Sequence, residues 1–558
     1  MNDTLINAIQ TFTLHARADL ERESHEQLEG LYGWLPDGSF APEDRYPALA
    51  IPEASESRAR LKQYAQDEGE AGFDAAKARS KLVREAAFTW LNRFVAIKML
   101  EKRRVLKTLL VTPERANAYL LWLADEHDSE AMGLHEAGDT PVNAMGEGPR
   151  QTAYRRFLLW QCGELSREMS VLFDPGTVAS RLCPRPNALN AVVANLNAEN
   201  LSEAWVPGNE ETIGWVYQGF NTDDKAAVFD SFQKGKKITA DMIGAATQIF
   251  TPHWVVKYLV DNSLGRLWIN MHPDSALKEK LTYFVPPAGD DAARSLKPVR
   301  EILFLDPSCG SMHFGLVAFD LFAEMYREEI AHAGQPGWPK KPSVAKEDEI
   351  PSAIVASNLY GIDLDPRAVQ ISALTLLIKA RGLNPQATVT DRNLACCNVE
   401  VITGGRLDAI IQGANFDQPI YGRILRAMAD RLKDSDNLGS LLRPERDLER
   451  LIDEEQEKLD RSAGLLPGMG ESDLFTLDTP EKKEKFFAGL AAVIATQLDE
   501  FVRQSRVAGK DEGHFVGEAS KGLNFLRLVQ KKYDVVATNP PYLDSRDYNA
   551  ILIFNSCK

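Results

Sequence analysis

Cysteine is scarce in this chain and long apolar runs are absent, and each absence excludes a class of protein. The 558 residues contain 6 cysteines, which lie neither in a disulfide framework nor in a paired Cys-X-X-Cys metal array. No stretch approaches the roughly 20 consecutive apolar residues that a membrane span requires. The N-terminus also lacks the apolar centre of a secretion signal. We therefore expect a reduced, cytoplasmic protein with no membrane partner.

Basic residues are also in short supply. The chain has 64 Lys and Arg against 80 Asp and Glu, which gives a formal net charge of −16. Phosphate contacts require Lys and Arg, so this balance argues mildly against nucleic-acid binding by these residues alone. An average over the whole chain says little about one cleft, however, and a basic DNA-gripping part can lie outside this sequence.

Length and pattern predict several domains. A chain of 558 residues is too long for one ordinary domain. Residues 1–240 are predicted to be mainly helical: 86–106 carries a broad apolar face and 154–174 repeats its style, both typical of packing scaffold. Between these two helices, residues 127–150 are rich in Gly and acidic residues, which indicates a loop.

From about residue 240 short apolar runs alternate with loops and helices. Residues 300–310 and 356–366 are predicted strands that each end at a loop, a helix follows over 367–382, and a further strand is predicted within 532–542. This alternation indicates an α/β sheet with ligands at the strand ends. We read 415–525 as a helical insertion, with an exposed charged helix over 443–464. The expected division is a helical N-terminal domain (1–240), a cofactor-binding part (241–414), the insertion (415–525) and a catalytic strand and loop (526–558).

The tetrapeptide Asn539, Pro540, Pro541 and Tyr542 ends the last predicted strand. Methyl transfer to an exocyclic amine needs acceptors for the amine hydrogens, and the Asn539 side-chain oxygen and the Pro540 carbonyl can both serve. The prolines fix the backbone, which supplies positioning, and Tyr542 offers a ring on which an extruded base can stack. A proline turn is the structural alternative. The position at the end of an apolar strand favours catalysis.

The segment after the 300–310 strand is the candidate cofactor loop. Gly310 allows the backbone to approach a ligand closely, and Asp306 at the strand end can pair with the amino group of a methionine moiety. Ser308 and Ser311 are further polar contacts. An ordinary strand–turn–helix corner is the structural alternative for this segment, because one Gly-rich turn is a weak signal.

Two carboxylates follow the second strand. Asp363 stands where that strand is expected to end, and a carboxylate there can accept both hydrogen bonds from a ribose diol. Asp365 precedes Pro366 and can equally cap the next helix. We prefer Asp363 for the ribose.

A Thr-Pro pair opens the amphipathic segment 247–268. Thr251 as helix cap and Pro252 in the first turn are sufficient structural roles. His253 and His313 each lack an evident metal partner, so we expect surface or packing roles and no metal site. Cys309 is expected to be a small packing residue.

In combination these segments resemble the gamma-type N6-adenine DNA methyltransferases, and most closely the PglX-like methyltransferases of BREX phage-defence systems. Residues 90–100, 213–221 and 247–268 carry the closer resemblance, together with 304–316. It implies a Rossmann-like S-adenosylmethionine-dependent sheet preceded by a helical domain. It further implies methylation of adenine in double-stranded DNA, with the base flipped out, and partners among other phage-defence proteins.

The resemblance also implies residue roles. Thr251 and Pro252 match the segment that contacts the methionine end of the cofactor, and Asp306 to Gly310 match the loop beneath it. Asp363 matches the ribose carboxylate, and Asn539 to Tyr542 match the catalytic motif. Asn398 stands roughly where relatives place the contact to the cofactor adenine.

The chain departs from the pattern in two places. Met312 stands where many adenine methyltransferases have Gly, and the sequence stops sixteen residues after Tyr542, before the strands and target-recognition domain expected in that family. We therefore expect an incomplete sheet and a chain without its base-reading part. Two other functions remain open: transfer to an RNA adenine or a glutamine amide, and a non-catalytic role in binding the cofactor or a partner protein.

Overall fold

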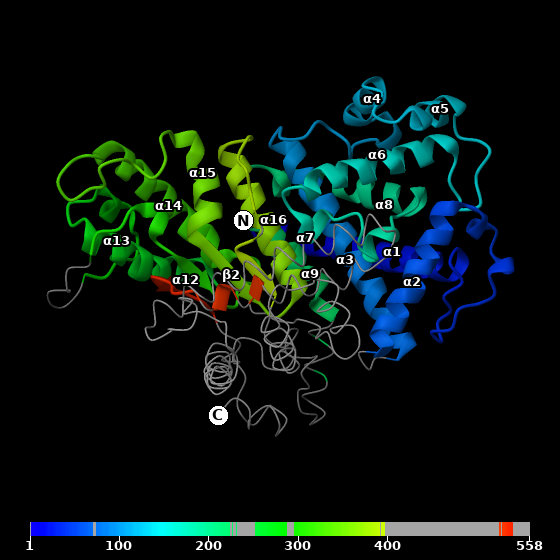
Figure 1. Cartoon of the computed structure of the whole chain (residues 1–558), viewed down its shortest axis with the longest axis horizontal. Coiled ribbons are helices and arrows are strands. Elements are labelled where there is room, and N and C mark those ends of the chain that lie inside the picture. The colour runs from blue at the N-terminus through cyan, green and yellow to red at the C-terminus, as the bar shows by residue number, and fades with distance from the viewer. Residues whose placement is uncertain are drawn as a thin grey trace, which may run out of the picture.

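The structure is a computed structural model of the chain (Figure 1). It describes residues 2–70, 74–223, 226, 230, 251–286, 295–390, 392–396, 524–525, 527–529 and 531–539.

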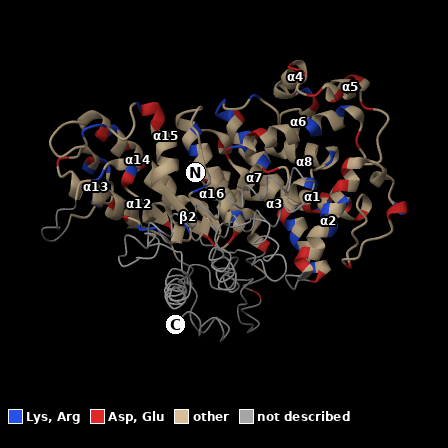
Figure 2. Cartoon of the chain, in the orientation of Figure 1, with Lys and Arg blue, Asp and Glu red and all other residues tan. Residues whose placement is uncertain are grey.

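The N-terminal part is helical up to residue 220. Its α-helices are α1 (Asp3–Gly30), α2 (Pro52–Glu70), α3 (Ala75–Lys102), α4 (Asn117–Ala124), α5 (Ser129–Ala137), α6 (Pro149–Ser166), α7 (Ser170–Phe173), α8 (Pro186–Leu196) and α9 (Thr212–Phe220). Short 3-10 helices cover Glu43–Arg45, Pro47–Ala50, Pro113–Arg115, Ala179–Arg181 and Glu199–Trp205. Acidic and basic positions are mixed along α2 (Figure 2).

Helix α3 is the centre of this part. Every residue from Ala86 to Glu101 is buried, so the expectation of a single apolar face was too narrow. The reason is that α3 contacts α1, α2, α8 and α16 around its circumference. A helix enclosed in this way must also satisfy its polar side chains. The Arg93 guanidinium does so by donating to the carbonyls of Leu172 and Asp174.

The prediction of a loop over 127–150 was wrong in part. Helix α5 lies inside this range, with the Asp128 carboxylate accepting from the Ala131 amide at its N-terminus. Ala131 is fully buried and α5 packs along α6. The glycines and acidic residues therefore flank a short helix whose stability comes from tertiary packing, which local composition does not reveal.

The second part contains the sheet and its covering helices. Its elements are α12 (His253–Val260), the π-helical turn η6 (Asp261–Gly265), α13 (Arg266–Met271), β1 (Phe304–Asp306), α14 (His313–His332), α15 (Ile350–Ala353), the π-helical turn η10 (Ile354–Asn358), β2 (Leu359–Asp363), α16 (Pro366–Leu383), β3 (Leu394–Cys396) and β4 (Val535–Val536). Short 3-10 helices cover Ala276–Lys280, Val299–Glu301 and Glu347–Glu349.

Within the described residues the strands form one sheet in the order β3-β2-β1-β4. All neighbours are parallel, with Phe304 opposite Leu359 on one side and Val535 on the other. Helix α14 connects β1 to β2, and α16 connects β2 to β3. The expected α/β arrangement with a parallel sheet is therefore present. The chain leaves β1 towards β2 and later returns to the opposite side of β1 as β4, so the strand order reverses at β1.

The two parts share one apolar core, which runs from Ile9 in α1 to Ala537 after β4. Helix α16 lies between them (Figure 1) and packs on α3, α7 and α9. Polar contacts also join the two parts: Arg381 pairs with Glu168 at 2.6 Å, and Arg367 donates to Asn221.

The predicted insertion (415–525) lies almost wholly outside the described residues, and the predicted helix over 443–464 lies entirely outside them. Among the described helices, none has the length and apolar character needed to cross a bilayer.

Candidate functional site

The carboxyl end of β1 presents a buried acid and a tight loop. Asp306, the last residue of β1, is 1% exposed. Its carboxylate accepts from the Ser308 amide at 3.1 Å. Gly310 follows with φ of +53°, and a methyl group added to it would meet no atom within 4 Å. The loop therefore turns through a glycine conformation beside open space.

The pKa of the Asp306 carboxyl is raised well above the ordinary value for an aspartate. Burial raises its pKa to about 7, the Ser308 amide and the nearby Thr538 side chain oppose this rise, and the charge of Asp363 adds to it. None of these groups is a cation. A cation placed beside this carboxyl would favour its ionised form, so the position suits a positively charged ligand group.

Asp363, the last residue of β2, braces the same loop. Its two carboxylate oxygens accept from the amides of Gly310 at 2.8 Å and Asp365 at 2.9 Å. Burial is the first cause that raises its pKa to about 6. The side chain is half-buried. Each carboxylate oxygen has two lone-pair sites and can accept more than one hydrogen bond.

The structure decides between the two roles left open for Asp365. Its carboxylate accepts from the Arg367 amide and so caps α16, and it also pairs with the Arg367 side chain at 2.9 Å. Its second oxygen accepts from the Tyr217 hydroxyl of α9 at 3.0 Å. Asp365 is therefore a cap that joins the helical part to the sheet.

Thr251 and Asn539 meet although 288 residues separate them. The Asn539 side-chain amide donates to the Thr251 hydroxyl at 2.9 Å. Helix α12 begins at His253, with Pro252 as its N-cap and no side-chain capping bond. The expected capping role of Thr251 was therefore wrong, because its hydroxyl contacts Asn539 instead. Both side chains are half-buried.

The remaining predicted residues lie around this edge or outside the described residues. Ser308 and Ser311 are half-buried in the β1 loop, and Pro252 is exposed. Asn398 lies outside the described residues, two positions after Cys396, the end of β3. Pro540, Pro541 and Tyr542 also lie outside them, so their catalytic roles stay predictions.

Met312 stands in a conformation that favours glycine, with φ of +64° and ψ of +31° at the N-cap of α14. Such a backbone costs a larger residue about 1 kcal/mol or more. The Met312 side chain is fully buried and lies where a Cβ of Gly315 would be, at 2.6 Å from the Met312 methyl carbon. Gly315 thus admits the side chain that Met312 adds to the loop.

Cys309 is buried, as expected for a packing residue. Burial raises the pKa of its thiol well above the ordinary value, which disfavours the reactive thiolate. The Ser372 hydroxyl donates to its sulfur at 3.3 Å.

His253 is exposed and His313 is buried, as the expected surface and packing roles require, and both lie beside Glu211. His253 Nδ1 lies 3.1 Å from Glu211 Oε1, and His313 Nε2 lies 3.4 Å from the same oxygen. Glu211 precedes α9, and the two histidines begin α12 and α14. The local sequence does not indicate this cluster, because its three residues come from distant segments of the chain.

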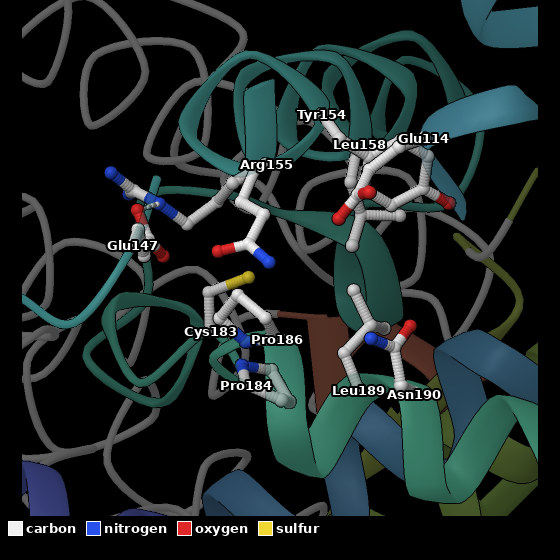
Figure 3. A pocket seen from close by; sticks show the side chains of 11 residues that line it. Glu114, Glu147, Tyr154, Arg155, Leu158, Cys183, Pro184, Pro186, Leu189 and Asn190 are labelled. Carbon is white, nitrogen blue, oxygen red and sulfur yellow. Dashed lines mark hydrogen bonds and ion pairs between the residues drawn. The ribbon is translucent and has the colours of Figure 1, made fainter. Parts of the chain in front are cut away.

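A small pocket opens elsewhere, in the helical part (Figure 3). Its lining is Glu114, Glu147, Gln151, Tyr154, Arg155, Leu158, Cys183, Pro184, Pro186, Leu189 and Asn190. The charged pair within it is already joined, since Arg155 Nε lies 3.0 Å from Glu147 Oε2. No residue of the sheet loops lines it, so we place the candidate site at the carboxyl edge of the sheet.

The chain is similar to one protein family and to two curated proteins. Residues 357–556 match the family described as Eco57I restriction-modification methylase. The chain is 28% identical over 544 residues to "Adenine-specific methyltransferase BrxX" of Escherichia coli O9:H4 (strain HS), covering 91% of this chain and 39% of that protein. It is 31% identical over 424 residues to "Adenine-specific methyltransferase PglX" of Lacticaseibacillus casei (strain Zhang), covering 68% of this chain and 33% of that protein.

The chain thus spans between a third and two fifths of the length of these curated relatives. The matched region begins just before β2 and includes Asp363 and Asn539. The chain is thus similar in sequence to the proteins named PglX and BrxX, and its residues 357–556 match the Eco57I restriction-modification methylase family.

Proposed function

We propose that this chain is the cofactor-binding and catalytic part of a site-specific DNA adenine-N6 methyltransferase of a BREX-type phage-defence system. One observation carries the proposal: Asn539, which contacts Thr251, follows the end of β4, and the buried Asp306 carboxyl stands at the end of β1, the strand beside it. The strand order reverses at this pair. Ligands of open parallel sheets bind outside the carboxyl ends of the strands at such a reversal.

S-adenosylmethionine fits the residues at this edge. Asp306 lacks a cation among the groups that set its pKa, and it would hold the ammonium group of the methionine moiety. Asp363 would accept the ribose hydroxyls, and Gly310 borders open space through which a ligand approaches the backbone. We propose Ser308, Thr251 and Pro252 as further contacts, and Asn398 as the contact to the cofactor adenine.

The cofactor supplies an electrophilic methyl group on a sulfonium. The protein's task is then to hold the adenine amine and orient its lone pair. Because the Asn539 side-chain nitrogen donates to Thr251, its oxygen remains the acceptor for an amine hydrogen. Thr251 is therefore a positioning residue, and the Pro540 carbonyl and the Tyr542 ring would complete the grip on a flipped base.

The proposal includes the architecture. We propose a Rossmann-like sheet that holds the cofactor, preceded by the helical domain over 1–240 and interrupted by the insertion over 415–525. Double-stranded DNA is the proposed substrate, and other phage-defence proteins are proposed partners. Such a protein would act in the cytoplasm.

The experiment is methyl transfer with isotopically labelled S-adenosylmethionine and duplex DNA, followed by nucleoside analysis. We expect labelled N6-methyladenine from the parent protein. Loss of one preorganised hydrogen-bonding group at a reacting centre costs about 100-fold or more, so Asn539→Ala should lower the rate by at least that factor. Asn209→Ala is the matched control, since this half-buried Asn donates to the backbone carbonyl of Glu203 within the helical part.

Other products separate the competing functions. Label in RNA or in a glutamine side chain would show that the substrate is not DNA, while the proposed site residues would still hold. Cofactor binding without label in any of the three, also with the remaining part of a relative supplied in trans, would favour a non-catalytic role. Unchanged N6-methyladenine formation by Asn539→Ala would refute the proposed catalytic residue.

A further inference from the structure

Three helix N-termini converge beside the candidate site, and they bring a carboxylate and two imidazoles together. Glu211 stands at the start of α9, His253 is the first residue of α12 and His313 is the first residue of α14. The three groups offer one ligand atom each, and these atoms all lie within 4.8 Å of one another. The proposed function uses none of the three side chains.

Two of the three separations match those around a tetrahedral metal ion, and the third is slightly shorter. His253 Nδ1 and His313 Nε2 lie 3.5 Å apart, and Glu211 Oε1 lies 3.1 Å and 3.4 Å from them. Zinc binds histidine nitrogen and carboxylate oxygen at about 2.0–2.2 Å in tetrahedral geometry, so its ligand atoms lie roughly 3.3–3.5 Å from each other. The three atoms thus describe one triangular face of such a tetrahedron.

Two explanations fit this arrangement, hydrogen bonds to Glu211 and a shared metal ion. His313 and His253 both lie within hydrogen-bonding distance of Glu211 Oε1, and a hydrogen bond from His313 is the first cause that lowers the pKa of Glu211. The metal explanation also accounts for the approach of the two ring nitrogens to each other, because ligand atoms of one ion lie close together. A shared cation gives all three atoms one partner. The positive ends of the helices oppose a cation here, and the Glu211 carboxylate offsets them.

The exposure of the cluster fits an ion that keeps one open position. The His313 side chain is 9% exposed and fixes one ligand from the protein interior. The His253 side chain is 59% exposed and Glu211 is 30% exposed, so an ion can enter from solvent. Three protein ligands with a water in the fourth position is a common zinc arrangement. Imidazole also suits cobalt and nickel.

We propose that Glu211, His253 and His313 form a binding site for a zinc-class divalent ion, which joins α9 to the first residues of α12 and α14. Thr251 lies two residues before His253, and the loop from Asp306 ends at His313. The ion would therefore hold the Thr251 segment and the Asp306 loop at a fixed separation. The expectation from the sequence was that no metal binds, and this proposal replaces it.

The test is titration of metal-depleted protein with Zn²⁺ by calorimetry and with Co²⁺ by visible absorption, in the absence of any methyl donor. We expect one equivalent of each ion and the intense visible bands of a tetrahedral cobalt site. We expect His253→Ala and Glu211→Gln each to weaken binding about 100-fold and to abolish the rise in Tm that the metal causes. His253 is exposed, so its removal should leave the fold intact, which circular dichroism checks.

His127→Ala is the matched control, because His127 also lies near a carboxylate, that of Asp125 at 4.0 Å, on the surface of the helical part. It should bind both ions as the parent protein does. The proposal is overturned if the parent protein binds no equivalent of Zn²⁺, if the folded His253→Ala variant binds with unchanged affinity, or if the control loses as much as that variant. None of these readouts depends on methyl transfer, so the proposed function can fail while this proposal stands.

Discussion

The helical part and the carboxyl edge of the sheet both bury carboxylates, and they treat them differently. In the helical part Glu147 is 1% exposed and pairs with Arg155, which also pairs with Glu53 at 2.5 Å. At the sheet edge Asp306 is equally buried, but burial dominates its pKa and no cation is among the groups that shift it.

This difference separates a structural charge from a charge kept for a ligand. A buried ion is tolerated when a partner and hydrogen bonds replace its water. Arg155 meets that condition within the protein, so the Glu147 carboxylate needs no ligand to balance its charge. Asp306 is stabilised only by hydrogen bonds, and groups in such a state cluster at functional sites. The two regions therefore predict opposite responses to substitution.

The largest expected effect is on the paired region. Arg155→Met would leave Glu147 buried without its cation, and breaking a buried pair in this way costs about 3–5 kcal/mol. Urea unfolding followed by circular dichroism would show the loss of stability. Arg167→Met is the control, since the exposed Arg167–Glu164 pair should change stability by less than about 1 kcal/mol. Equal losses in both variants would contradict the comparison.

The second-largest expected effect is on cofactor binding at the carboxyl edge of the sheet. Asp306→Asn keeps the side-chain shape and removes the charge, so the empty protein should unfold at the same urea concentration or a higher one. Its affinity for S-adenosylmethionine should fall about 10- to 100-fold, because a hydrogen bond to a charged group contributes about 1.5–3 kcal/mol. Calorimetry measures the change.

Asp320→Asn controls for a general effect of removing an acid, because Asp320 is exposed on α14 and should leave the affinity unchanged. If Asp306→Asn bound the cofactor like the parent, Asp306 would be a structural acid like Glu147. If it unfolded as readily as Arg155→Met, the contrast between the regions would disappear.

The smallest effect is the pH dependence of stability. The pKa of Asp306 is about 7 in the folded protein, above the value of roughly 3.9 for an unfolded chain. The folded state therefore holds this proton more tightly, and the stabilisation is complete below about pH 4 and is lost as the pH rises through about 7. Between pH 6 and pH 8 the parent should lose about 1 kcal/mol more stability than Asp306→Asn.

Unfolding of both proteins at each pH measures this difference. If the stability of the parent changed no more than that of Asp306→Asn over this interval, the carboxyl would not titrate between pH 6 and pH 8 and the raised pKa would be contradicted. Cofactor binding should respond in the opposite direction, tightening as the carboxyl loses its proton, because the ionised form pairs with the ammonium group.

Residues at strand ends were accessible from the sequence. Short apolar runs that end in Asp or Asn predicted β1, β2 and the last strand, and parallel strands bring their carboxyl ends to one edge. For that reason the sequence alone indicates Asp306, Asp363 and Asn539 as site residues. The local signal was strong because a buried parallel strand has few alternatives for its composition.

Contacts between distant segments were not accessible. The Thr251 hydroxyl has the local pattern of a helix cap, yet it contacts Asn539, and Asp365 gains a partner in Tyr217. Helix α5 was obscured by the glycines around it, and the cluster of Glu211, His253 and His313 draws on three separate segments. In each case the deciding neighbour lies far away in the chain.

The sequence alone determined the α/β character of the second half, the acids and the amide at its strand ends, and the resemblance to adenine methyltransferases. These depend on local periodicity and on residue types whose chemistry is intrinsic. Only the tertiary structure decided which side chain orients Asn539, which acid caps α16 and where two histidines meet a glutamate. Such choices depend on packing between elements, and packing free energies outweigh the local preferences of a single residue.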